Sequence, residues 1–139
     1  MKVFIDTNIL VDITDSREFA QEGRMIFQLG VRGDIEVCAS YLTFANLNYI
    51  LRNRSCAERY KIIRQLRQGL LVLPCDTKQL DLALSEKEVR DFEDMLQYQC
   101  ALASGCDVIV TNNIRDYRDF CQVPCMTSRN FLLDYFSQH

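Results

Sequence analysis

Histidine is almost absent from this sequence, which has one in 139 residues, His139 at the very end. A nucleophilic hydrolase of the Ser-His-Asp or Cys-His kind would have to recruit that final residue, so we set this class aside. The seven cysteines are an odd number and include no C-x-x-C pair, which argues against most zinc sites and favours reduced, mostly buried thiols. Carboxylates, in contrast, are plentiful, with 19 aspartate and glutamate residues.

Long apolar runs and an excess of positive charge are missing as well. The apolar start of the chain is interrupted at Asp6, too early for a signal-peptide core or a membrane span, so we expect a cytoplasmic protein. A net charge of -3 provides no general attraction to phosphate, so a nucleic acid would have to bind a local basic patch. With 48% apolar residues and no linker or repeat, the sequence predicts a single domain over residues 1–139.

Short apolar segments alternate with longer amphipathic ones along the chain, a pattern typical of a parallel sheet covered on both faces. We therefore predict an α/β fold, a three-layer α/β/α sandwich with a mostly parallel sheet of about five strands. The predicted strands lie within residues 3–5, 35–38, 69–76, 107–113 and 121–127. The last of these should be an edge strand, because Pro124 cannot donate to a central ladder. The predicted helices lie at residues 17–30, 41–51, 55–68, 76–85, 91–105 and 128–136.

Two further predictions concern single residues of these helices. Ser55 and Glu58 have the spacing of a capping box, which marks the start of a helix. Helical periodicity places Tyr60 and Phe92 on the buried sides of their helices.

Polar side chains gather just after the predicted strands. Those after the first and fourth strands are Asp6, Thr7 and Asn8, and Thr111, Asn112, Asn113 and Asp116. Asp91, Glu93 and Asp94 begin the helix that leads into the fourth strand. Because the carboxyl ends of parallel strands border one crevice, these distant segments could bring their acids to one place. Clustered carboxylates favour a hard cation such as Mg²⁺ or Mn²⁺, so the predicted chemistry is hydrolysis of a phosphodiester.

Each of these acids also has a purely structural interpretation. Asp6 could be the N-cap of a helix that follows it. Asp91 and Asp94 have the spacing of a capping pair, in which we interpret Asp91 as the cap, whereas Asp94 can serve both roles. Asp116 could simply terminate a turn. A phosphatase with an aspartyl nucleophile at Asp6 is a further possibility, but the usual D-x-D pattern is missing because Asn8 stands at its second position.

The segments "FIDTN", "DFEDMLQ" and "CDVIVTNNIRDY" occur in this order and resemble the motifs of the PIN-domain family of metal-dependent ribonucleases. The resemblance covers nearly the whole chain, and these segments look most like those of the compact bacterial VapC-type toxins. It implies a parallel sheet of about five strands and a crevice in which acids bind one or two Mg²⁺ or Mn²⁺ ions. By this resemblance Asp6, Asp94 and Asp116 are the catalytic, metal-binding acids. The supporting residues are Thr7, Asn8, Thr111 and Asn113.

One position departs from the family pattern. The family usually has a glutamate on the helix after the second strand, and Asn46 stands in its place. An amide oxygen can coordinate a cation or hold a water, but it carries no charge. Asp91 and Glu93 are candidates for supplying the missing charge, and the sequence does not decide whether they do. An alternative function is therefore a catalytically weakened PIN-like domain that acts as an RNA-binding or protein-interaction module.

An RNA substrate also requires cations. Positive charge is concentrated in residues 52–67, although this segment could equally be a solvated helix face. Arg115, next to Asp116 in the chain, is the predicted substrate-binding residue. The resemblance implies a Mg²⁺- or Mn²⁺-dependent endoribonuclease, the toxin of a toxin-antitoxin pair, which forms a homodimer and is bound by a small antitoxin near the crevice.

Overall fold

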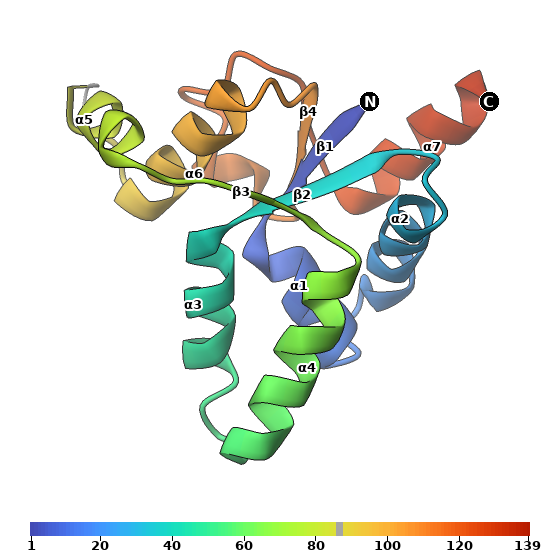
Figure 1. Cartoon of the computed structure of the whole chain (residues 1–139). Coiled ribbons are helices and arrows are strands. Elements are labelled where there is room, and N and C mark those ends of the chain that lie inside the picture. Colours follow the sequence, from blue (N-terminus) through green and yellow to red (C-terminus); the bar gives the residue numbers. More distant parts are fainter. Residues whose placement is uncertain (86–87) are drawn as a thin grey trace.

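The computed structural model describes residues 1–85 and 88–139 and confirms the predicted α/β fold (Figure 1). Five strands form one sheet in the order β3-β2-β1-β4-β5, and every neighbouring pair is parallel. The strands are β1 (Lys2–Ile5), β2 (Glu36–Ser40), β3 (Leu71–Leu73), β4 (Val108–Val110) and β5 (Cys125–Met126). The chain winds outward from β1 to β3 and then returns to place β4 on the other side of β1. The winding therefore reverses between β1 and β4.

Helices connect the strands and cover the sheet. Within the described residues they are α1 (Thr7–Thr14), α2 (Ala20–Val31), α3 (Tyr41–Ile50), α4 (Cys56–Gln68), α5 (Thr77–Ser85), α6 (Phe92–Ala103), the short 3₁₀ helix η1 (Ile114–Asp116) and α7 (Ser128–Gln138). None of these described helices is both long enough and apolar enough to cross a membrane.

Different helices cover the two faces of the sheet. Val3 and Ile5 of β1 belong to a core that they share with residues of α1, α2, α3, α4 and α7. Phe4, between them, belongs to a second core formed with α5 and α6. In Figure 1, α5 and α6 accordingly lie apart from α1, α2 and α4. Because both faces of β1 are buried, its sequence is an uninterrupted apolar run rather than an alternating one.

Some predicted boundaries differ from the structure. The helix predicted at residues 17–30 begins at Ala20, because a turn closed by a hydrogen bond from the Ala20 N–H to the Arg17 carbonyl (3.0 Å) precedes it. The additional helix α1 starts directly after Asp6. β3, β4 and β5 are shorter than the segments that predicted them, and β5 is an edge strand, as predicted from Pro124.

The prediction for Ser55 is confirmed, because its hydroxyl oxygen accepts a hydrogen bond from the Glu58 N–H (3.2 Å). The predicted burial of Tyr60 and Phe92 is wrong, since these side chains are 53% and 45% exposed. Tyr60 lies in the N-terminal half of α4, which extends away from the sheet (Figure 1). Phe92 is the first residue of α6.

Candidate active site

Asp6 lies where the winding of the sheet reverses. Its N–H donates to the Val110 carbonyl (3.0 Å) and so continues the pairing of β1 with β4. Its side chain accepts a hydrogen bond from the Thr7 N–H (2.8 Å), which makes Asp6 the N-cap of α1. The other carboxylate oxygen accepts from the Thr111 hydroxyl (2.9 Å) and the Asn8 amide (3.2 Å). The capping interpretation is therefore correct, and it leaves one oxygen directed toward β4.

Three more acids gather beside Asp6. Carboxylate oxygens of Asp91, Asp94 and Asp116 lie within 4.8 Å of one another. Asp91 is also the N-cap of α6, where it accepts a hydrogen bond from the Asp94 N–H (3.2 Å), as predicted. Of the predicted acids, the structure thus places Asp94 and Asp116 together, and Asp6 lies close enough for its charge to raise the pKa of Asp94.

Burial and mutual repulsion oppose the ionisation of the two innermost acids, since the side chains of Asp6 and Asp94 are only 6% and 7% exposed. Burial raises the pKa of Asp94 from 3.8 to about 8, and the charge of Asp6 and of the other neighbouring acids adds to this shift. Burial likewise raises the pKa of Asp6 to about 6, although the hydrogen bonds from Thr111 and Thr7 oppose the shift. A cation among these acids would stabilise their charged forms.

The chemistry of the donor set fits a hard divalent cation. In the part of the chain that the structure describes, the group that could hold an ion consists of carboxylates alone, with no histidine or cysteine among its members. Oxygen-only ligands suit Mg²⁺ and Mn²⁺ rather than zinc or copper.

The predicted supporting residues contact the acids or one another. The Asn113 amide donates to Asp116 (2.7 Å), and the Asn113 N–H donates to the Thr111 hydroxyl (3.0 Å). The Asn8 amide also lies 3.3 Å from the Thr111 hydroxyl. Asn113 therefore acts as a donor that fixes the Asp116 carboxylate.

Asn46 has a different contact. Its amide nitrogen donates to a carboxylate oxygen of Glu93 at 2.6 Å, across 47 residues of sequence. The charge of Glu93 is in turn among those that raise the pKa values of Asp6 and Asp94. Asn46 is thus linked to the acid group through Glu93.

Two polar side chains of the site were not predicted from the sequence. Tyr117 is fully buried, and its hydroxyl donates a hydrogen bond to Asp94 (3.3 Å). Burial is the main cause that raises the pKa of Tyr117 well above the usual range, and the negative charges of Asp6 and Asp94 add to the shift. Gln97, also fully buried, accepts from the hydroxyls of Ser40 (3.0 Å) and Thr43 (3.3 Å). The available signals were a tyrosine directly after the last acid and a glutamine one turn after Asp94.

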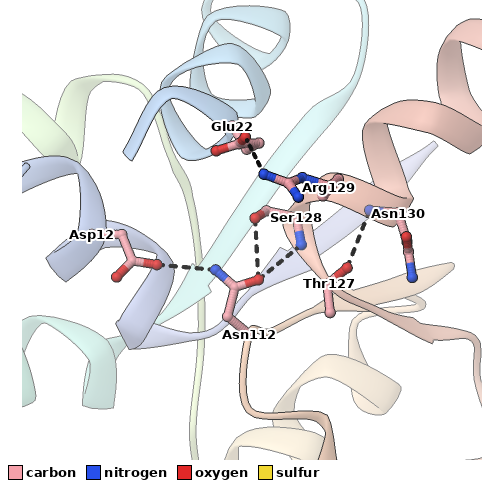
Figure 2. Close-up of polar contacts among 7 residues, drawn as sticks. All are labelled: Asp12, Glu22, Asn112, Thr127, Ser128, Arg129 and Asn130. Carbon is pink, nitrogen blue, oxygen red and sulfur yellow. Dashed lines mark hydrogen bonds and ion pairs between the residues drawn. The ribbon is translucent and has the colours of Figure 1, made fainter. Parts of the chain in front are cut away.

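A second polar network fixes the loop after β4, as Figure 2 shows. The Asn112 side chain donates to Asp12 on α1 (3.0 Å) and accepts from both the N–H and the hydroxyl of Ser128 (3.0 and 3.1 Å). Asp12 and Ser128 are buried. Asn112 therefore joins α1 to the start of α7 and holds the loop that carries Thr111 and Asn113.

A cavity of about 630 Å³ adjoins the acid group at Asp116. Arg115 and Arg90 are among its lining residues, together with Phe120. The structure therefore places the predicted substrate-binding residue in a cavity wall that carries a second guanidinium. Guanidinium groups bind phosphate oxygens in a fixed, two-pronged geometry.

Two cations of the basic segment at residues 52–67 contact other groups of the protein instead. Arg54 forms an ion pair with Asp15 (2.6 Å), and Arg59 donates to the Arg54 carbonyl (2.6 Å) and to Asn48 (3.1 Å). These contacts favour the structural interpretation for these two cations.

Comparison with known proteins agrees with this fold. The PIN domain model matches residues 2–115, and the chain belongs to the PIN-domain family. Among curated proteins, the chain is 24% identical to ribonuclease VapC1 from Aquifex aeolicus over 135 residues, which cover 94% of this chain and 92% of the relative.

Solved structures with the same fold come from toxin-antitoxin complexes. VapBC2 from Rickettsia felis, bound to a DNA fragment from its promoter, matches with a TM-score of 0.67 and 16% identity, covering 90% of this chain and 97% of the other. VapBC from Salmonella typhimurium, also bound to DNA, matches with a TM-score of 0.66 and 24% identity, covering 92% and 98%. At these identities the likeness establishes the fold.

Proposed function

We propose that this protein is an endoribonuclease that hydrolyses phosphodiester bonds in RNA and depends on Mg²⁺ or Mn²⁺. The observation that carries the proposal is the group of carboxylates at the reversal point of the sheet, where Asp6 and Asp94 are buried and have raised pKa values. Membership in the PIN-domain family and the likeness to ribonuclease VapC1 support it. The proposed catalytic, metal-binding residues are Asp6, Asp94 and Asp116.

The chain's own residues would hold and orient the reacting groups. A divalent ion held by the acids would lower the pKa of a bound water and stabilise charge on the phosphoryl group. Thr111 and Asn8 prevent the Asp6 carboxylate from rotating, and Tyr117 does the same for Asp94. Asn113 orients Asp116. Such preorganised ligands need little rearrangement on metal binding.

The cavity beside Asp116 is the proposed entry for RNA. Arg115 and Arg90 would each bind a phosphate of the strand and so place one phosphodiester beside the acids. We assign substrate binding to Arg115 on this basis.

We further propose that the protein is the toxin of a toxin-antitoxin pair in the cytoplasm, where it forms a homodimer and binds a small antitoxin protein. The solved VapBC complexes and a toxin-antitoxin complex from Klebsiella pneumoniae support the antitoxin partner. Exposed aromatic side chains on α3 and α4, among them Tyr41, Tyr49 and Tyr60, offer an apolar surface for a protein partner. The seven cysteines are free, which fits a reducing compartment.

A catalytically weakened, RNA-binding PIN domain is the second candidate, because Asn46 stands where the family usually has a glutamate. The test is incubation of the protein with a mixed RNA pool and Mn²⁺, followed by sequencing of the cleaved ends. We expect metal-dependent cleavage that decreases at least about 100-fold in Asp94→Asn, since a bound divalent ion contributes several kcal/mol of transition-state stabilisation and this variant removes one of its proposed ligands.

The matched control for this experiment is Asp134→Asn, which removes an exposed aspartate from α7 and should cleave at the wild-type rate. Equal cleavage by the wild type and Asp94→Asn would contradict the proposed site. RNA binding without any cleavage would establish the second candidate.

A further inference from the structure

Asn46 and Glu93 meet at the edge of the acid group from two different helices. Asn46 lies on α3 and Glu93 in the first turn of α6, one residue before Asp94. The distance between the Asn46 amide nitrogen and the nearer Glu93 oxygen is 2.6 Å, which is short even for a hydrogen bond to a charged acceptor.

Glu93 lies between two members of the acid group along the chain. It follows the N-cap Asp91 and precedes Asp94 at the start of α6, and carboxylate oxygens of these two neighbours lie within 4.8 Å of each other and of Asp116. Among the described residues, the ion pairs are Arg32 with Asp34, Arg54 with Asp15 and Arg129 with Glu22, so no lysine or arginine there balances Glu93. A helix N-terminus favours an acid, but that effect does not require an asparagine from another helix to hold it.

The hydrogen bond from Asn46 has a clear physical effect. An exposed glutamate side chain normally samples several rotamers, and a charge-assisted bond to the Asn46 amide restricts it to those that face α3. Asn46, which stands where the family usually has a glutamate, therefore holds the carboxylate of a residue on α6.

We propose that Glu93 is a further carboxylate of the metal site, supplied from α6 in place of the usual glutamate on α3, and that Asn46 is the positioning residue that holds it. This inference rests on the proposed metal-dependent function. It explains how a chain with an amide at position 46 still supplies a carboxylate at this side of the site.

The test measures Mn²⁺ binding to the full-length protein by calorimetric titration and by the rise in melting temperature, with no RNA present. We expect Glu93→Gln to weaken Mn²⁺ binding about tenfold, because affinity for hard cations follows the number of charged ligands. Glu58→Gln is the matched control, since Glu58 is likewise exposed in the first turn of its helix, α4, and should leave Mn²⁺ binding unchanged.

Asn46 is tested through its dependence on Glu93. We expect Asn46→Ala to weaken Mn²⁺ binding severalfold on its own but to add no further loss to Glu93→Gln, because the two residues act through one contact. The charge-relocating double variant Asn46→Glu with Glu93→Gln should recover most of the wild-type affinity. Additive losses from Asn46→Ala and Glu93→Gln would show that Asn46 contacts the ion independently and would overturn its positioning role.

These outcomes separate the inference from the function on which it rests. One result would overturn the inference alone: the wild type binds Mn²⁺, Asp94→Asn does not, and Glu93→Gln binds Mn²⁺ with the same affinity as Glu58→Gln. Glu93 would then not belong to the metal site, while the proposed function would stand. If the wild type binds no Mn²⁺ at millimolar concentration, the proposed metal site and this inference are both wrong.

Discussion

Asp94 is the acid whose ionisation in the folded protein is most unfavourable. Its pKa is about 8 in the folded state and near 3.8 in the unfolded chain, so between these values the folded state binds a proton that the unfolded state lacks. Its contribution to the free energy of unfolding is therefore fully favourable below about pH 4 and decreases as the pH rises toward 8.

We predict that Asp94→Asn stabilises the metal-free protein at pH 8, raising its melting temperature by a few degrees, and has a much smaller effect at pH 4. The neutral amide avoids the repulsion that the carboxylate meets at high pH. Calorimetry in EDTA checks this, with Asp134→Asn as the exposed control. Equal melting temperatures of the wild type and Asp94→Asn at pH 8 would show that the ionised Asp94 carboxylate does not destabilise the folded protein.

The sequence predicted the acids of the candidate site better than their surroundings. Asp6, Asp94 and Asp116 follow recognisable motifs, and the structure places them in one region. Tyr117 and Gln97 were missed because a buried tyrosine or glutamine has the same sequence signature as an ordinary core residue. The contact of Asn46 with Glu93 could not be predicted from the sequence either, since it depends on how α3 and α6 pack.

At the scale of elements, the side chain of Asn112 links the loop after β4 to two helices. Asn112 satisfies the buried Asp12 carboxylate and both donors of Ser128, so α1 and α7 meet through it (Figure 2). The network continues from α7 to α2 through the Arg129–Glu22 ion pair (3.4 Å).

We predict that Asn112→Ala lowers the free energy of unfolding by about 2–3 kcal/mol, because it leaves buried polar groups without partners. It should also lower RNA cleavage, since Thr111 and Asn113 lie on either side. Urea denaturation measures the stability change, and Asn130→Ala, at an exposed position in α7, should cost less than about 0.5 kcal/mol. A loss no greater than that of Asn130→Ala would mean that water or the neighbouring backbone replaces these bonds.

The type and order of the elements followed from the sequence, but their ends did not. Ser55 was recognised as a helix start because capping is a local interaction. The turn before Ala20 and the shortness of β3 and β4 depend on neighbouring elements, which no local pattern contains. The burial of Tyr60 was wrongly predicted because periodicity identifies the apolar side of a helix but does not show how far the helix extends beyond the sheet.

At the scale of the whole molecule, the net charge of -3 and the local cations act in opposite directions on RNA. Binding should therefore depend on a few phosphate contacts and weaken with salt in proportion to their number. We predict that Arg115→Gln weakens RNA binding and lowers the slope of log affinity against log salt by about 1. Fluorescence anisotropy in EDTA at several salt concentrations checks this.

The control for Arg115 is Arg118→Gln, because Arg118 is exposed and is not among the residues that line the cavity beside Asp116. It should leave the salt slope nearly unchanged. Equal slopes for the two variants would place the RNA path elsewhere on the surface.

The central pairing of β1 with β4 joins segments about 105 residues apart, as does the hydrogen bond from Thr111 to Asp6. During synthesis Asp6 emerges from the ribosome about 90 residues before Asp94 and about 110 residues before Asp116. The acid group can therefore assemble only after Asp116 has left the exit tunnel. For the proposed ribonuclease, this order of events keeps the nascent chain inert until all three acids are outside the ribosome.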